Sequence, residues 1–80
     1  MTRSDLLERV QEICRDVFDD EELSISEATM SADVASWDSL THLSLINEIE
    51  ETFNIAFTLD EVTASKNIGE LLNAIEKHMA

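Results

Sequence analysis

Hydrophobic side chains recur every three or four residues over the first eighteen positions, which is the spacing of one face of an α-helix. The residues on this face are Leu6, Leu7, Val10, Ile13, Cys14, Val17 and Phe18. Thr2 followed by Asp5 has the spacing of a capping box, so the pattern predicts a helix from about residue 3 to Phe18. Four acidic residues follow at 19–22, and their charge opposes the helix dipole, which favours an end there.

Residues 19–38 are rich in Ser, Asp and Ala and predict a long connection. Loops of this length usually have a function or are held to the core by a few side chains. The spaced apolar residues are more consistent with an ordered loop than with disorder. The predicted anchors are Leu23, Ile25, Met30 and Val34.

A second helical pattern follows residue 38. Its predicted apolar side consists of Leu40, Leu43, Ile46, Ile49 and Phe53, broadened by Leu45. Glu48, Glu50 and Glu51 lie on the other side, so we expect an amphipathic helix with an acidic outer face.

Two shorter patterns complete the chain. Ile55, Phe57 and Leu59 alternate as in a strand, but a single strand has no partner, so we expect an extended connector. Thr58 and Glu61 form a capping-box pattern that predicts a short helix over 59–64, and Asn67 with Glu70 predicts the start of the last helix. Gly69 weakens the first turn of that helix by about 1 kcal/mol relative to Ala. The apolar stripe of the last helix is Ile68, Leu71, Leu72, Ile75 and Met79.

Three longer amphipathic helices and one short helix satisfy their apolar faces by packing against each other. The sequence therefore predicts an all-α fold, a small bundle that forms one domain over residues 1–80. We expect a monomer, because each apolar stripe has a use inside the bundle.

Composition and charge exclude several classes of protein. Five basic and 18 acidic residues give a net charge of −13, which repels nucleic acid and anionic membranes and favours a partner with a basic patch. One cysteine cannot form an intrachain disulfide, and no hydrophobic run exceeds the three residues 55–57, so we expect a cytoplasmic protein without a membrane span. A calcium loop needs a glycine at its turn, and the only glycine is Gly69, so we expect no specific metal site.

The tract Trp37-Asp38-Ser39-Leu40 stands where the long loop meets the second helix. A serine at a helix start is often only a cap for a backbone N–H group. It can also carry a phosphate ester, because the free N–H groups and positive dipole end of a helix favour an anion. Residue type alone leaves both interpretations open.

A wider pattern surrounds Asp38-Ser39-Leu40. A helix runs from it through Glu48-Ile49-Glu50-Glu51, then come Phe53-x-Ile55-x-Phe57 and Ile68-Gly69-Glu70-Leu71. Together these features resemble the acyl carrier proteins over nearly the full length of the chain. The resemblance implies that a phosphopantetheinyl transferase, which supplies Mg²⁺ and the general base, esterifies Ser39 with 4′-phosphopantetheine from coenzyme A. It implies a freestanding, non-catalytic carrier that holds acyl groups as thioesters for fatty-acid- or polyketide-type biosynthesis.

The resemblance also implies two surfaces. An acyl chain would lie between the second and third helices, flanked by Leu43, Ile46, Leu59 and Val62. Acyl-loading and acyl-processing enzymes would bind through basic patches to the partner-recognition residues Asp38, Leu40, Glu48, Glu50 and Glu51. The competing interpretation of the acids is that they simply keep a small domain soluble.

Trp37 and His42 depart from the usual family pattern, as do Ser36 and Ser44. If Asp38 is the N-cap, Trp37 and His42 occupy the two positions of a hydrophobic staple, although direct contact with a partner is the alternative. A partly protonated His42 would also attract a phosphodiester on Ser39.

The sequence also suggests three other functions. An aminoacyl, peptidyl or D-alanyl carrier would share the fold and the serine. An acidic helical adaptor that binds a basic protein through the second helix would need no prosthetic group. Ser39, His42 and Asp38 together suggest a hydrolase triad, but no nucleophile elbow, oxyanion donors or enclosed pocket accompany them, so we expect no enzyme.

Two further residues have simpler interpretations. Cys14 lies on the apolar stripe of the first helix, so we expect a buried side chain. His78 lies near the C-terminal end of the last helix, where it complements the helix dipole.

The net charge of −13 generates a first prediction. Like charges repel within the folded domain, and salt screens this repulsion. The melting temperature should therefore rise by several degrees when NaCl or Mg²⁺ is added to a low-salt solution. Differential scanning calorimetry measures it, and a melting temperature that does not change with ionic strength would contradict the prediction.

Overall fold

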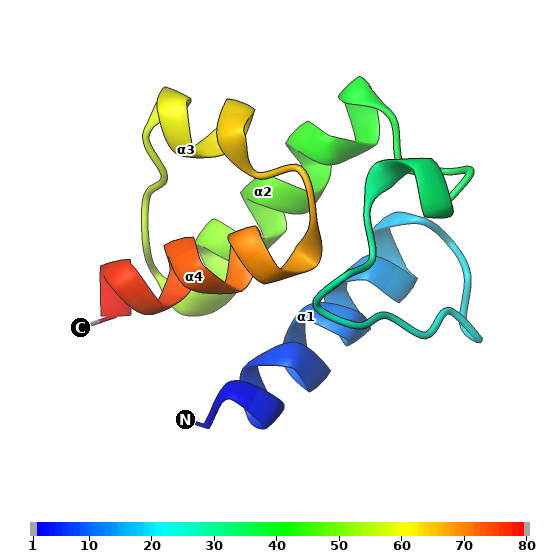
Figure 1. Ribbon diagram of the computed structural model, residues 1–80, viewed down its shortest axis with the longest axis horizontal. Helices are drawn as coiled ribbons and strands as arrows, with labels where there is room; N and C mark the ends of the chain where they lie inside the picture. Colours follow the sequence, from blue (N-terminus) through cyan, green and yellow to red (C-terminus); the bar gives the residue numbers. More distant parts are fainter. Residues whose placement is uncertain (1, 80) are drawn as a thin grey trace.

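The computed structural model describes residues 2–79, and within this range the chain is helical. The elements are α1 (Arg3–Val17), the short 3₁₀-helix η1 (Ser31–Asp33), α2 (Ser39–Phe53), α3 (Leu59–Ala64) and α4 (Ile68–Met79). The expected bundle of three longer helices and one short one is confirmed. The segment between α2 and α3 forms neither a helix nor a strand over residues 55–58 and connects the two helices, in agreement with the predicted connector (Figure 1).

Short-range capping bonds start the helices at the predicted places. Thr2 Oγ1 accepts a hydrogen bond of 3.1 Å from the Asp5 amide, and Thr58 Oγ1 accepts one of 3.2 Å from the Glu61 amide. In both cases the acidic side chain bonds back to the amide of the capping residue. Asn67 Oδ1 accepts a bond of 2.8 Å from the Glu70 amide at the start of α4. These bonds occupy N–H groups that a helix start leaves without an intrahelical partner.

The core lies between α1, α2 and α4. Its fully buried large side chains are Val10, Cys14, Leu45, Ile49, Ile68, Leu71, Leu72 and Ile75. The expectation that Cys14 is buried is confirmed, and this burial raises the pKa of its thiol to about 12. Helix α3 buries no residue completely, and Val62 is its partly buried contact with the core. None of the helices within residues 2–79 has the length and apolar character needed to cross a membrane.

The predicted apolar stripe of α2 was partly wrong. Leu40 is 76% exposed and Leu43 is 59% exposed, whereas Leu45 is completely buried. Consecutive residues are about 100° apart around an α-helix, so Leu40, which precedes Ile49 by nine positions, lies on the opposite side. Residues spaced three apart do not stay on one side of a helix, because three residues turn it by only about 300°. The side of α2 that packs on the core is formed by Leu45, Ile46 and Ile49.

Two other predicted core positions are also corrected. Met30 is 41% exposed and Met79 is 47% exposed, the latter in the last turn of α4. Ile25 and Val34 do anchor the long connection, as expected. Trp37 is a further anchor, since it is 5% exposed and its ring centroid lies 5.9 Å from that of Phe18.

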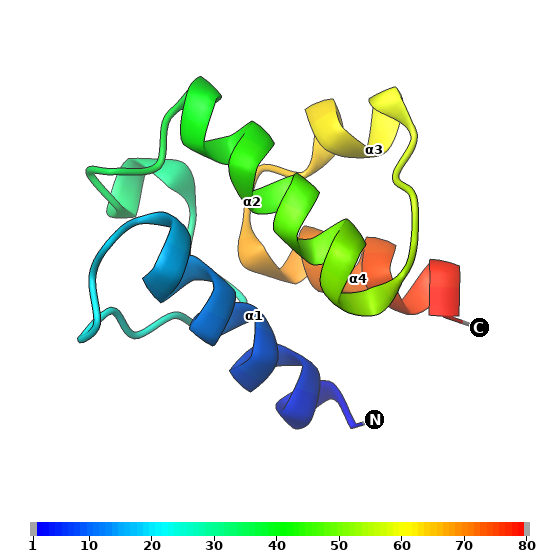
Figure 2. The ribbon, with the colours of Figure 1, turned by 180° about the vertical axis from the view of Figure 1, so that it is seen from behind.

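The long connection passes around the end of the bundle and returns to the start of α2 (Figures 1 and 2). It is fixed to the start of α4 by hydrogen bonds of 2.9 Å from the Ile68 amide to the Thr29 carbonyl and from the Gly69 amide to the Glu27 carbonyl. A Cβ atom at Gly69 would lie 3.0 Å from that Glu27 oxygen. Glycine at this position lowers the helix propensity of the first turn, but it permits this close backbone contact.

Arg3 joins three segments that are distant in sequence. Its guanidinium forms two hydrogen bonds with the Glu27 carboxylate, of 3.2 and 2.7 Å, and a third with Glu76 in α4. It also donates to the Gly69 carbonyl at 3.2 Å. The same bonds raise the pKa of Arg3 and lower the pKa of Glu27, with the Arg3–Glu27 hydrogen bond as the largest cause of each shift.

Replacement of Arg3 by Met should lower the melting temperature by a few degrees, because exposed ion pairs contribute modestly and both the long connection and α4 lose their shared partner on α1. This decrease in melting temperature should be smaller at high salt, because salt screens ion pairs. Arg9→Met is the matched control, since Arg9 is an exposed residue of the same helix and its loss changes the net charge equally. Equal melting temperatures for the two variants would contradict a special role of Arg3.

Candidate functional site

Asp38 caps the start of α2. One of its carboxylate oxygens, Oδ1, accepts hydrogen bonds from the amides of Leu40 at 3.0 Å and Thr41 at 2.9 Å. Thr41 Oγ1 accepts a bond of 2.8 Å from the Asp38 amide and donates one of 2.7 Å to the Ser36 carbonyl. These contacts, led by the Thr41 N–H, hold the pKa of Asp38 below its usual value. Asp38, and not Ser39, is therefore the N-cap.

Ser39 is the first residue of α2 and is exposed. Within residues 2–79 its hydroxyl group has no hydrogen-bond partner, so the oxygen is accessible for covalent modification. The expectation of several free N–H groups around it needs correction, because Asp38 already occupies the amides of Leu40 and Thr41. A phosphate on Ser39 would thus lie next to a carboxylate.

An open cleft of about 760 Å³ lies beside Ser39. One wall comes from α2 and includes Ser39, His42 and Leu43. The opposite wall comes from α3 and the residues after it, including Val62, Thr63 and Lys66. The end of the long connection closes a third side with Met30 and its neighbours, which explains why Met30 is not packed in the core.

His42 connects the walls of this cleft. The Trp37 indole N–H donates a hydrogen bond of 3.0 Å to His42 Nδ1, and His42 Nε2 lies 3.1 Å from the Val62 carbonyl oxygen. An indole N–H only donates and a carbonyl only accepts, so this network requires a neutral imidazole with its hydrogen on Nε2. In this arrangement His42 bridges Trp37 and the backbone of α3, while its attraction to a phosphodiester on Ser39 stays a prediction.

The expected staple between Trp37 and His42 is confirmed. Their ring centroids are 6.0 Å apart and the ring planes are inclined by 22°, a stacked arrangement. Trp37 thereby fixes the last turn of the long connection against the first turn of α2.

The four residues expected to flank an acyl chain are separated by the fold. Leu43 and Val62 line the cleft. Ile46, by contrast, is 5% exposed and belongs to the core, and Leu59 is 77% exposed and is not part of the cleft wall.

The residues expected to recognise partners also differ from one another. Glu50 Oε2 accepts a hydrogen bond of 2.8 Å from the Phe57 amide, so Glu50 holds the connector after α2. Glu48 is half-buried and Glu51 is exposed. Leu40 presents a mostly exposed side chain directly beside Ser39. The residues expected on one docking surface thus have different surroundings: Asp38 caps a helix, Glu50 holds a connector and Leu40 is mostly exposed.

Helix α3 has a second polar attachment, at the neighbouring residue Glu61. His78 Nε2 lies 2.7 Å from Glu61 Oε1, and the His78 ring contacts the Phe57 ring edge-on at 5.8 Å. The backbone N–H of Thr58 and then His78 lower the pKa of Glu61 to about 2. His78 therefore does more than complement the dipole of α4, since it links α4 to α3.

Some residues of the cleft were not expected from the sequence. Thr63 and Lys66 reach it from α3 and the segment after α3, far from Ser39 along the chain, and Met30 reaches it from the long connection. No local motif marks these residues. The available signal was the scarcity of positive charge, since Lys66 is one of only five basic residues. In the described part of the chain, no three His, Cys, Asp or Glu side chains converge as a metal site would require.

Comparison with known proteins agrees with this geometry. The family model of the phosphopantetheine attachment site matches residues 8–75. The fold is similar to the solution NMR structure of a holo acyl carrier protein from Geobacter metallireducens, with a TM-score of 0.86 and 35% sequence identity over 92% of this chain and 85% of that chain. None of the curated proteins matches the sequence significantly.

Because the family model spans most of the chain, the protein belongs to the family of phosphopantetheine-bearing carrier proteins. Its cofactor is covalently attached 4′-phosphopantetheine, and it acts as a carrier and not as an enzyme. Its partners accordingly include a phosphopantetheinyl transferase and enzymes that process the carried group.

The His42 network yields a prediction for stability. His42→Phe keeps an aromatic ring against Trp37 but leaves both the indole N–H and the Val62 carbonyl without their partner. Trp37→Phe removes the indole donor together with part of the buried ring, and the cycle subtracts that packing loss. A double-mutant cycle measured by urea denaturation should give a coupling energy of about 1 kcal/mol between the two positions. Strictly additive losses would show that the hydrogen bond from Trp37 to His42 contributes nothing to the stability of the fold.

Proposed function

We propose that Ser39 is the attachment residue for 4′-phosphopantetheine and that the protein carries acyl groups for fatty-acid- or polyketide-type biosynthesis. The observation that carries the proposal is the exposed Ser39 hydroxyl, without a partner in the described part of the chain, at the edge of an open cleft. The position fits the group, because the oxygen is accessible and the cleft offers space beside it.

The loading reaction requires little from the carrier itself. Ser39 Oγ attacks the phosphorus of coenzyme A that bears the pantetheine arm, forming a phosphodiester, and adenosine 3′,5′-bisphosphate leaves. The hydroxyl proton passes to the base of the transferase. The carrier presents Ser39 on a helix start that is held rigidly by the Asp38 cap and by the stacked Trp37 and His42 rings. A fixed nucleophile reduces the entropic cost of reaching the reactive geometry.

The surface around Ser39 supports docking of enzymes. Leu40 and Leu43 are 76% and 59% exposed, so an apolar patch lies next to the attachment serine. Glu51 adds exposed negative charge farther along α2, and Glu48 is partly accessible. A partner that presents an apolar contact edged by basic residues would match this surface, and its association rate would fall with salt.

Two observations favour an acyl cargo over an aminoacyl, peptidyl or D-alanyl cargo. A similar solved structure is that of an acyl carrier protein, at 35% identity. The strong negative charge suits the electrostatic docking that the acyl-carrier resemblance implies. An adaptor without a prosthetic group would not account for the match to the attachment-site family.

Incubation with coenzyme A, Mg²⁺ and a broad-specificity phosphopantetheinyl transferase should add the mass of one phosphopantetheine. Ser39→Ala should abolish the gain while leaving the circular dichroism spectrum unchanged. Ser44→Ala, which alters another exposed serine of α2, should load normally. Loading of Ser39→Ala would contradict the assignment of the attachment residue.

The cargo is tested with the loaded protein. A malonyl-transferring enzyme should acylate its thiol, whereas aminoacyl-adenylating enzymes should not. Efficient loading of an amino acid together with no malonyl transfer would replace the acyl assignment by an aminoacyl carrier.

A further inference from the structure

The surroundings of Ser39 pose an electrostatic problem for a phosphodiester. The carboxylate of Asp38 caps the same helix start and occupies the amide groups of Leu40 and Thr41. The protein as a whole has a net charge of −13. An added phosphate therefore lies beside a negative group and in a negative field, and a nearby cation would offset this repulsion.

The chain contains only five basic residues, and most are engaged or placed elsewhere. Arg3 is paired with Glu27 and Glu76, and Arg15 Nε donates a hydrogen bond of 2.7 Å to the Leu23 carbonyl. Arg9 and Lys77 lie on α1 and in the last turn of α4 and are not part of the cleft wall.

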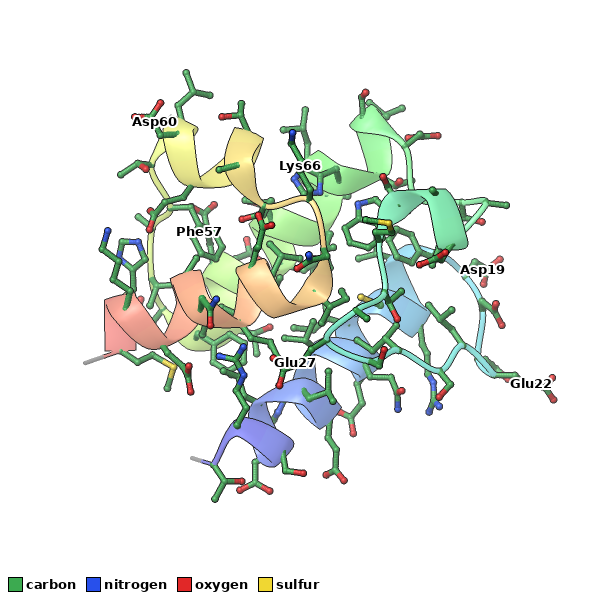
Figure 3. All side chains as sticks on the ribbon, viewed as in Figure 1. Asp19, Glu22, Glu27, Phe57, Asp60 and Lys66 are labelled. Carbon is green, nitrogen blue, oxygen red and sulfur yellow. The ribbon has the colours of Figure 1, made fainter. Side chains whose placement is uncertain are left out.

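Lys66 is different, because it lines the same cleft as Ser39. It follows α3 on the short connection to α4, and Figure 3 shows it on the side of the molecule where α2 begins. Its backbone amide donates to Glu70 Oε2 at 3.2 Å, which fixes the main chain. Its ammonium group has no ion-pair partner within residues 2–79.

We propose that Lys66 is the counter-ion of the phosphodiester on Ser39 and that this ion pair holds the prosthetic arm folded into the cleft against α3. The inference rests on the proposed attachment at Ser39. An ion pair at the Ser39 end directs the rest of the arm between Leu43 and Val62, whereas an unpaired phosphodiester leaves it free to extend. Lys66 is thus a positioning residue that sets the balance between a sheltered and an extended cargo.

The expected size of the effect follows from the exposure of the cleft. Solvent-exposed ion pairs shift an equilibrium by roughly two- to fivefold, and salt weakens them. Removal of the Lys66 charge should therefore lower the ratio of folded to extended arms by about that factor. Such a shift leaves the fold and the loading of Ser39 intact.

A nitroxide spin label on the thiol of the loaded arm measures this ratio. Cys14 does not compete for the label, because it is fully buried and its thiol has a pKa of about 12. When the arm is folded, the nitroxide accelerates the relaxation of amide protons in α3 and in η1, which NMR reports residue by residue. The variants are Lys66→Gln, Lys66→Arg and, as a control with the same change in net charge, Lys77→Gln.

The relaxation enhancement is proportional to the folded fraction of arms, so at Thr63 and Ser31 it should fall by up to about fivefold in Lys66→Gln. It should also fall in the wild type at high salt and stay unchanged in Lys77→Gln. Lys66→Arg should retain it. Equal enhancement in wild type and Lys66→Gln would overturn the inference. A protein that fails to load at Ser39 is recognised beforehand by intact mass, and that result would contradict the attachment site instead.

A carboxylate on the cargo is a second possible source of the anion. Arms that carry an acetyl or a malonyl group, made as stable amide analogues, distinguish the two sources through the chemical shifts of Thr63 and Ser31. If the chemical shifts of Thr63 and Ser31 depend on Lys66 with both arms, the result supports pairing of Lys66 with the phosphodiester. A dependence for the malonyl arm alone would overturn that assignment and transfer the counter-ion role to the cargo.

Discussion

The rotation of α2 about its own axis is fixed by the complete burial of Leu45 and Ile49 against the neighbouring helices. Once these two side chains are in the core, helical geometry determines the direction of every other residue of α2. Leu40 and Leu43 point outward next to Ser39, and His42 points inward, where it meets Trp37 and the backbone of α3. The exposed apolar surface around Ser39 is therefore a consequence of core packing about two turns farther along the helix.

The parts of this structure that could be predicted from the sequence depend on residues three or four positions apart. The capping pairs Thr2–Asp5 and Thr58–Glu61 are complete within a single turn, so their spacing alone located the starts of α1 and α3. Ser39 was recognisable as a candidate because its motif is contiguous. The cleft was not predictable in the same way, because the path of the whole chain brings Met30 and Lys66 to it. The expected acyl site included Ile46, but the rotation of α2 places this side chain in the core.

Helix α3 is held mainly by polar contacts at two points and buries no side chain completely. Both histidines of the chain take part, His42 from α2 at the Val62 carbonyl and His78 from α4 at the Glu61 carboxylate. Hydrogen bonds can exchange with water at a small net cost, whereas exposing a buried apolar side chain is expensive. The wall of the cleft formed by α3 is thus less firmly held than the three-helix core, as the proposed folding and release of a prosthetic arm would require.

The burial of Cys14 has a consequence for the chemical lifetime of the cargo. Thioesters exchange readily with thiolates, so a reactive cysteine in the carrier would compete with the arm for its own acyl group. Burial raises the pKa of the Cys14 thiol to about 12, so the thiol stays protonated at pH 7, and its sulfur is completely shielded by the core. Acyl migration from the arm to the polypeptide is thereby suppressed, and the energy of the thioester is conserved for the enzyme that receives the cargo.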